Sequence, residues 1–103
     1  MVAVNWTDQA IEDIGNIAEF IAKDSLKYAK IQTQRFFERA EILEKHLKSG
    51  RIVPELNDES IRELILGNYR IIYKIVSETQ IDILTVHHSR RPIENSPVFS
   101  KKE

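Results

Sequence analysis

Arg70, His87 and His88 are the residues whose types and spacing could act on a phosphate. Arg70 lies in the stretch GNYRIIY, and the two histidines end the stretch ILTVHH. An arginine beside a histidine at a sheet end can stabilise a phosphorane and donate a proton to a leaving oxygen. Glu55 follows Pro54 in a loop that could reach the same groove. These residues raise the hypothesis of a phosphate-directed site at one end of a sheet.

A structural interpretation of the same residues stays open. Arg70 can pair with Glu63 or with acidic groups of a partner protein, and His87 can be an ordinary strand residue. His87 and His88 are adjacent in a strand, so they point to opposite faces and cannot ligate one metal ion together. The remaining histidine, His46, falls in a predicted helix. We therefore expect neither a metal site nor a cofactor.

The composition is that of one small soluble domain. The chain has 103 residues, 42% of them hydrophobic and 30% charged, with a net charge of −1 and no cysteine. This net charge argues against a general nucleic-acid coat. No apolar run approaches the roughly 20 residues of a membrane span, and the first residues, MVAVNW, lack the pattern of a signal peptide. We expect a cytoplasmic protein with no membrane partner.

Apolar residues recur at helical spacing in two segments of the first half. Thr7 is a good N-cap for a helix that runs to about Lys23. Ser25 caps a second helix, which the sequence predicts to continue to Ser49 and Gly50. Because the link between them is so short, the two helices must fold back on each other as a hairpin. A short strand over residues 2–6 precedes them.

The second half has the alternation of β-strands. Gly67 and Asn68 suit a two-residue hairpin turn, with glycine taking the positive φ. Residues 51–60 read as a loop or brief strand, because Pro54 is unsuited to a central strand. The predicted strands are 61–66, 69–76 and 81–87. The fold class is therefore α+β, with a helical hairpin packed on one face of a mainly antiparallel sheet. We expect a single domain over residues 1–93 and a flexible tail over 94–103.

The register of these strands predicts two unlike faces. Leu66 opposes Tyr69 across the turn, and pairing Val76 with Ile81 extends the register into the third strand. One face then holds Arg62, Leu64, Leu66, Tyr69, Ile71, Tyr73, Ile75, Asp82, Leu84, Val86 and His88. The other holds Ile61, Glu63, Ile65, Arg70, Ile72, Lys74, Val76, Ile81, Ile83, Thr85 and His87. The first is more apolar in its middle and should pack on the helices.

The second face is charged, yet it presents several isoleucines and valines. A single soluble domain rarely leaves so large an apolar patch exposed to water. We infer that another chain, or this chain's own tail, covers part of it. An ordinary mixed face in contact with solvent remains the alternative.

Several motifs in a fixed order carry a family resemblance: GRIVPE, IREL, GNYRIIY and VHHSRR, preceded by the first helix. With these motifs the chain resembles the RelE/ParE superfamily of type II toxins over about residues 2–93, and the ParE branch most. The resemblance implies a βααβββ fold. It also implies a co-encoded antitoxin whose C-terminal segment wraps the toxin.

The resemblance leaves two activities to separate. ParE-like members inhibit DNA gyrase and are not enzymes in any established sense, whereas RelE-like members cut mRNA on the ribosome. By resemblance, the nuclease residues would be Glu55, Arg70 and His87 or His88. The lysine-rich strand of RelE is missing, and a net charge of −1 is low for entering the phosphate-rich ribosomal A site. We therefore predict a ParE-like gyrase inhibitor. The alternatives are a RelE-like mRNA endonuclease and an inactive toxin that only binds its antitoxin.

The remaining expectations concern binding residues. Arg62 should be structural and pair with a carboxylate such as Asp82. Arg90 and Arg91 follow the last strand, and we predict that they contact the target. An extended or amphipathic antitoxin segment needs an apolar strip with a polar rim, which the second face offers. The predicted antitoxin-binding residues are Ile65, Arg70, Ile72, Lys74 and Ile83.

Overall fold

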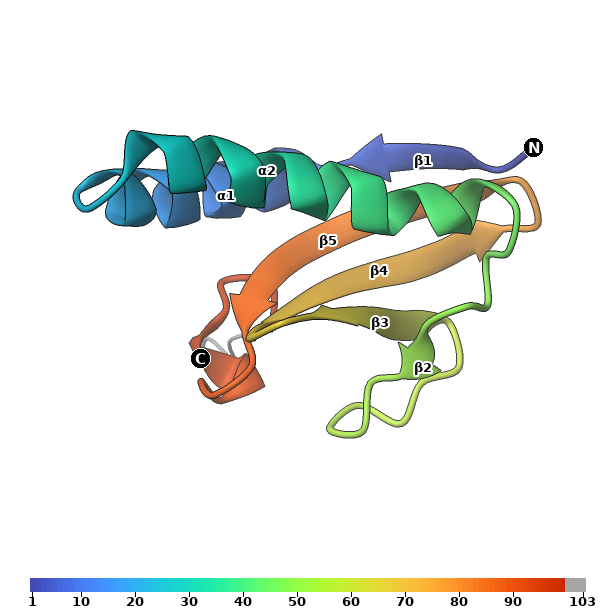
Figure 1. Ribbon diagram of the computed structural model, residues 1–103. Helices are drawn as coiled ribbons and strands as arrows, with labels where there is room; N and C mark the ends of the chain where they lie inside the picture. Colours follow the sequence, from blue (N-terminus) through green and yellow to red (C-terminus); the bar gives the residue numbers. More distant parts are fainter. Residues whose placement is uncertain (100–103) are drawn as a thin grey trace.

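Two helices and a five-stranded sheet form the structure, a computed structural model that describes residues 1–99. The helices lie together over one face of the sheet (Figure 1). None of the helices in this described part is long and apolar enough to cross a membrane. The elements in chain order are β1 (Ala3–Trp6), α1 (Asp8–Ala22), α2 (Leu26–Ala40), the 3-10 helix η1 (Glu41–Glu44), β2 (Arg51–Ile52), β3 (Ile61–Leu66), β4 (Tyr69–Ser77), β5 (Gln80–His88) and the 3-10 helix η2 (Ile93–Asn95).

The sheet has the strand order β1-β5-β4-β3-β2. β1 pairs with β5 in parallel, and the other neighbours are antiparallel. Leu66 opposes Tyr69 as predicted, and Gly67 has a φ of 57°, which suits the tight turn between β3 and β4. The predicted α+β class with a mainly antiparallel sheet is therefore confirmed.

The helices begin where their capping residues predict. Thr7 Oγ1 accepts a hydrogen bond from the Ala10 N–H at 3.3 Å, and Ser25 Oγ accepts one from the Tyr28 N–H at 3.1 Å. The predicted end of the second helix near Gly50 is wrong, since α2 stops at Ala40 and continues as η1. This tighter turn places Leu43 in the core, where it is fully buried.

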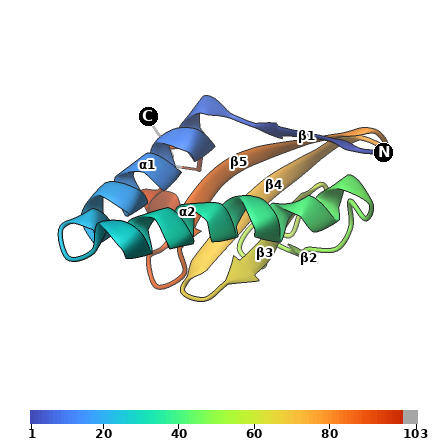
Figure 2. The same ribbon diagram turned by 45° about the horizontal axis from the view of Figure 1, so that its top comes forward.

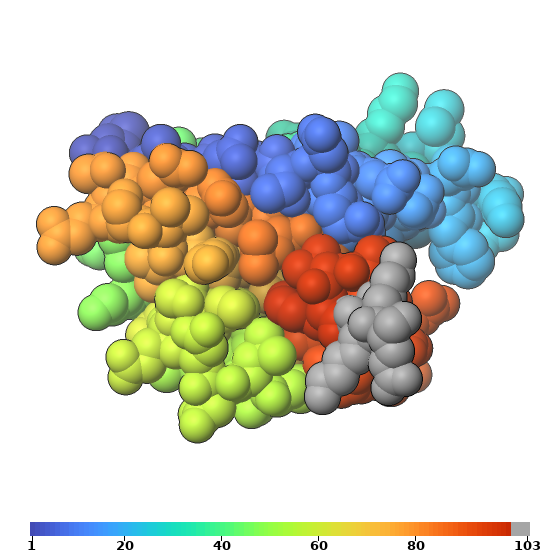
Figure 3. All heavy atoms as spheres, turned by 180° about the vertical axis from the view of Figure 1, so that it is seen from behind, coloured from blue at the N-terminus to red at the C-terminus, as the bar shows by residue number. Residues whose placement is uncertain are grey.

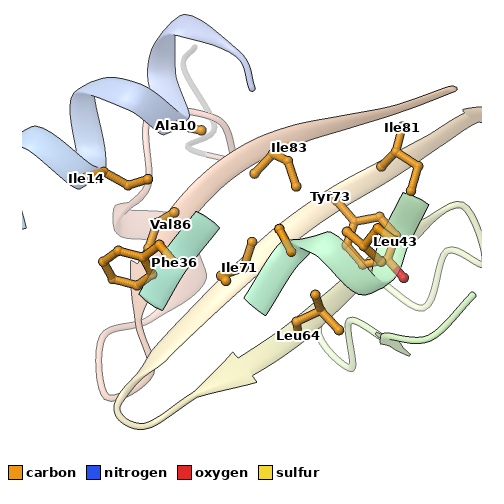
Figure 4. Close-up of a cluster of buried hydrophobic side chains, with 11 residues drawn as sticks. Ala10, Ile14, Phe36, Leu43, Leu64, Ile71, Tyr73, Ile81, Ile83 and Val86 are labelled. Atoms are coloured by element: carbon orange, nitrogen blue, oxygen red, sulfur yellow. The ribbon is translucent and has the colours of Figure 1, made fainter. Parts of the chain in front are cut away.

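The main core lies between the helices and the sheet (Figure 4). At about 25 cal/mol per Å² of buried apolar surface, this layer is the main stabilising term of the domain. Tyr73 adds two hydrogen bonds at its edge, because its hydroxyl donates to the Leu47 carbonyl at 2.8 Å and accepts from the Gly50 N–H at 2.9 Å. The buried residues are Ala10, Ile14, Phe36, Ala40, Leu43, Leu64, Ile71, Tyr73, Ile81, Ile83 and Val86.

The register between β4 and β5 corrects the predicted faces. Arg70 opposes His87 as predicted, but Tyr73 opposes Ile83 rather than Leu84, and Ile81 opposes Ile75 rather than Val76. An irregularity after Ile72 leaves an extra residue on β5, and such a bulge moves the following side chains to the other face. Ile81 and Ile83 therefore belong to the core beneath the helices.

The chain's own segments cover the second face. Ile72 packs with Val53 and Ile93 in a smaller buried cluster. Figure 3 shows the loop that precedes β3 and the C-terminal segment filling this side next to each other. Of the predicted tail, residues 94–99 pack against the rest of the chain, with Ser96 buried and Phe99 beside the Ile72 cluster. Residues 100–103 lie outside the described residues.

Candidate functional site

An ion network occupies the second face where the sequence suggested a phosphate site. Arg70 Nε donates to Glu63 Oε1 at 2.5 Å. Its Nη1 and Nη2 donate to the two carboxylate oxygens of Glu55 at 2.7 and 2.8 Å. Glu63 Oε2 accepts from Arg51 Nε at 2.6 Å. Because the side chains of Arg70 and Glu63 are only 7% and 0% exposed, both charges depend on these partners.

The elements around this network explain its assembly. Arg70 lies opposite Ile65, and Glu63 is two residues from Ile65 along β3. Arg70 and Glu63 are therefore diagonal neighbours whose side chains share a face. Glu55 follows the buried Val53 in a turn, in which the Leu56 N–H donates to the Val53 carbonyl at 3.1 Å. The turn brings the Glu55 carboxylate over the guanidinium, and the bidentate pair fastens the loop to the sheet.

The pairing has a clear electrostatic result. The hydrogen bonds from Arg70 lower the pKa of Glu55 from 4.5 to about 2. The hydrogen bonds to Glu55, and next those to Glu63, raise the pKa of Arg70. Glu55 is therefore a carboxylate at neutral pH and a weak base. The Arg70 guanidinium is already engaged by two carboxylates.

His87 serves a different set of contacts. It is 8% exposed, and its Nε2 lies 3.1 Å from both the Arg91 and the Pro92 carbonyl oxygens. Since both neighbours are acceptors, Nε2 must carry the proton and donate. Among the described residues, no hydrogen bond joins His87 to Arg70 or Glu55. His87 holds the start of the C-terminal segment against the sheet.

His88 lies on the opposite face and belongs to an exposed cationic turn. Its ring meets Tyr69 edge-on with centroids 5.5 Å apart, and its Nδ1 accepts from the Arg90 N–H at 3.2 Å. Arg90 and Arg91 are exposed, as predicted. The sequence therefore placed these two cations correctly at the end of the sheet.

A groove of about 530 Å³ lies beside the last residues of β5, between α1 and the C-terminal segment. Asp13 fixes its wall, because the carboxylate accepts from the Val86 N–H at 3.0 Å and from the Thr85 hydroxyl. Sequence analysis missed Asp13. Helical periodicity identifies the apolar residues of α1, but it does not show where β1 stops pairing with β5. Because that pairing ends at Trp6 and Ile83, the backbone of β5 beyond this point is open to a side chain such as Asp13. The lining residues are Gln9, Glu12, Asp13, Asn16, Ile17, Phe20, Tyr69, Thr85, Val86, His87, His88, Arg91, Asn95, Ser96 and Pro97.

Comparison with known proteins decides the family. Residues 4–93 match the model of the ParE toxin of type II toxin–antitoxin systems, parDE. The chain belongs to the ParE toxin family. A solved structure of the chromosomal ParDE system from P. aeruginosa is 21% identical with a TM-score of 0.70, over 85% of this chain and 96% of that one. The search of curated proteins gave no match.

The predicted antitoxin-binding residues of this ParE-like toxin do not form one surface. Arg70 and Ile72 are buried under the chain's own loop and C-terminal segment, and Ile83 lies in the core beneath the helices. Ile65 and Lys74 are exposed. The sequence led us to expect that another chain or this chain's own tail covers part of the second face, and in the structure the loop before β3 and the C-terminal segment of this chain cover Ile72.

Two smaller expectations can also be compared with the structure. Arg62 is structural, but it donates to the carbonyls of Gly50 and Glu59, each at 3.1 Å, rather than to Asp82. In the described part of the chain, no group of three or more metal-ligating side chains could hold a metal ion.

Proposed function

We propose that this ParE-like toxin inhibits DNA gyrase by protein–protein contact and is neutralised by a co-encoded antitoxin. The observation that carries the proposal is the engagement of Glu55, Arg70 and His87 in structural contacts. Membership of the ParE toxin family also supports gyrase as the target. The ribosome-dependent nuclease is the competing function.

The chemistry of RNA cleavage argues for gyrase over the ribosome. A nuclease needs a base for the ribose 2′-OH, a cation for the developing charge on phosphorus and an acid for the leaving oxygen. Glu55, with a pKa of about 2, is a weak base and is held by Arg70. Arg70 is buried and paired, and His87 Nε2 is committed to backbone carbonyls.

The surface we assign to the target is the turn after β5. Arg90 and Arg91 are exposed there, beside the half-buried His88. Cationic side chains on a projecting turn favour a partner surface of opposite charge and speed its association. The antitoxin would use the part of its predicted site that remains open, Ile65 on β3 and Lys74 on β4.

A supercoiling assay with purified toxin and gyrase tests the proposal. We expect loss of supercoiling or trapped DNA cleavage complexes, relieved by the antitoxin. The double variant Arg90→Glu, Arg91→Glu should weaken inhibition. The matched control Lys45→Glu, Lys48→Glu makes the same charge change on exposed residues and should not.

Two outcomes would contradict the proposal. Cleavage of ribosome-bound mRNA by wild-type toxin, with gyrase unaffected, would establish the nuclease. Normal growth on overexpression without antitoxin would indicate an inactive toxin that only binds its antitoxin.

A further inference from the structure

The outer side of the helical hairpin, away from the sheet, carries an apolar groove. The two helices converge toward their linker, which extends past the sheet (Figures 1 and 2). The groove has a volume of about 430 Å³, and almost all of the surface that lines it belongs to apolar atoms. Its lining residues are Ala18, Glu19, Ala22, Leu26, Ala29, Lys30, Thr33 and Gln34.

The groove exists because the apolar arc of α1 is wider than the sheet can cover. Ala10 and Ile14 enter the core. Ile11 is 46% exposed, and helical spacing puts it on the side of α1 that carries Ala18 and Ala22. Leu26, at the start of α2, is 62% exposed at the groove. An exposed apolar strip of this kind on a soluble protein is typical of a docking surface.

The two helices that border the groove carry opposite charges. α1 holds four acidic residues, Asp8, Glu12, Asp13 and Glu19, and no lysine or arginine, for a net charge of −4. α2 holds Lys27, Lys30, Arg35 and Arg39 against Glu38, for a net charge of +3. At the groove itself Glu19 faces solvent from α1, and Lys30 does so from α2.

This polarity makes the surface complementary to itself. A two-fold axis along the groove would place α1 of one copy over α2 of the other. Glu19 would then meet Lys30 of the second copy, and the same contact would form twice. An axis across the groove would instead place α1 on α1, with like charges opposed. A two-fold axis along the groove is therefore the symmetry that buries the apolar strip and also brings opposite charges together.

We propose that two copies of this chain associate through the outer side of the α1–α2 hairpin. The acidic α1 and basic α2 of a second copy complement the charges that border the groove. Each helix has 15 residues, about 22 Å at 1.5 Å per residue. Two such helices side by side, each about 10 Å wide, offer a face of roughly 440 Å². That is less than the roughly 800 Å² per partner of a standard interface. The dimer is therefore weak, reversible and dependent on concentration.

Analytical ultracentrifugation of the purified full chain tests the proposal without gyrase or antitoxin, so its outcome is separable from that of the proposed function. The apparent mass of the wild type should rise from monomer toward dimer between low and high micromolar concentration. Ala18→Arg, which places a long charged side chain in the groove, should remain monomeric over this range. Lys45→Glu, outside the hairpin, should behave as the wild type.

Charge reversal gives the sharper result. Glu19→Lys and Lys30→Glu should each weaken association at least tenfold, because each opposes like charges. An equimolar mixture of the two variants should restore association. In the mixed dimer, each of the two contacts pairs a lysine of the Glu19→Lys chain with a glutamate of the Lys30→Glu chain. Both residues are exposed, so neither change should disturb the fold.

Three results would overturn the proposal. One is a wild type that stays monomeric throughout. Another is a dimer that both charge-reversal variants leave unchanged. The third is a monomeric toxin whose hairpin amides are protected from hydrogen exchange by an antitoxin segment, which would assign the groove to the antitoxin.

Discussion

The two faces of the sheet are built from different interactions. Under the helices, large apolar side chains such as Phe36 and Ile71 pack without a charged group among them. On the other face, Glu63 and Arg70 are as deeply buried as the core, and they are held by Glu55 and Arg51. The helix side obtains its stability from apolar area, and the second face depends on complete pairing of its charges.

The difference between the two faces shows how a buried ion network can contain the same residue types as a nuclease site. A buried ion network contributes little net stability but is costly to break, because removing one member leaves an uncompensated charge. Here it fastens the loop after β2 to β4, while His87 fastens the C-terminal segment. The Glu55, Arg70 and His87 that the resemblance implies for a nuclease are thus engaged in contacts that hold these two segments.

Breaking the network should give the largest effect. Glu63→Ala leaves Arg70 buried without its closest carboxylate, and we expect a loss of about 3–5 kcal/mol in the free energy of unfolding. Denaturant unfolding followed by circular dichroism measures it. Glu59→Gln, an exposed neighbour, serves as the control. A loss below about 1 kcal/mol would mean that the network does not hold this face.

Two adjacent residues of β3 compare the faces directly. Leu64 is 2% exposed under the helices, and Ile65 is 42% exposed on the other side. Leu64→Ala should cost about 2–5 kcal/mol, because it leaves a cavity in the core. Ile65→Ala should cost less than about 1 kcal/mol, since little packing is lost. Equal losses in denaturant unfolding would contradict the assignment of the faces.

The polar edge of the main core should show a smaller effect. Tyr73→Phe keeps the ring but removes the hydroxyl that joins Leu47 and Gly50. We expect a loss of about 1–2 kcal/mol, because the Gly50 N–H is left without its partner. Thermal unfolding measures it, with the exposed Tyr28→Phe as control. An unchanged midpoint would show that the hydroxyl does not stabilise this corner.

The smallest effect is a dependence of stability on pH. The folded-state pKa of Glu55 is lowered to about 2, so its carboxylate stabilises the protein fully above the ordinary value of 4.5 and loses that effect as pH falls toward 2. Its side chain is 38% exposed, so solvent screening reduces the contribution to about 1 kcal/mol. Glu55→Gln should flatten this part of the stability profile. A variant profile parallel to that of the wild type would contradict the pairing.

Much of the fold followed from the sequence, because periodicity and turn chemistry are local. The capping residues Thr7 and Ser25 and the turn at Gly67 each marked an element boundary. The bulge on β5 was not predictable, since Leu84 is apolar and compatible with either face. The end of α2 at Ala40 was missed because the apolar period continues through Leu43 and is satisfied equally well by a 3-10 turn.

Sequence analysis named three residues of the ion network, Glu55, Glu63 and Arg70, but did not predict how they are arranged. Pairing of Arg70 with Glu63 was foreseen as the structural alternative, and the Arg70–His87 register was correct. That Glu55 completes the network depends on the path of a loop, which no periodic pattern specifies. The burial of Ile72 beneath Val53 and Ile93 is likewise a long-range contact between irregular segments.

Growth arrest by the Glu55→Gln toxin, expressed without antitoxin at the wild-type level, tests the structural role of this network most directly. If the glutamate only anchors a loop, the variant should arrest growth as the wild type does, with slightly lower stability. A variant that unfolds at the wild-type midpoint but no longer arrests growth would show that the carboxylate acts in toxicity itself, and the account would be wrong.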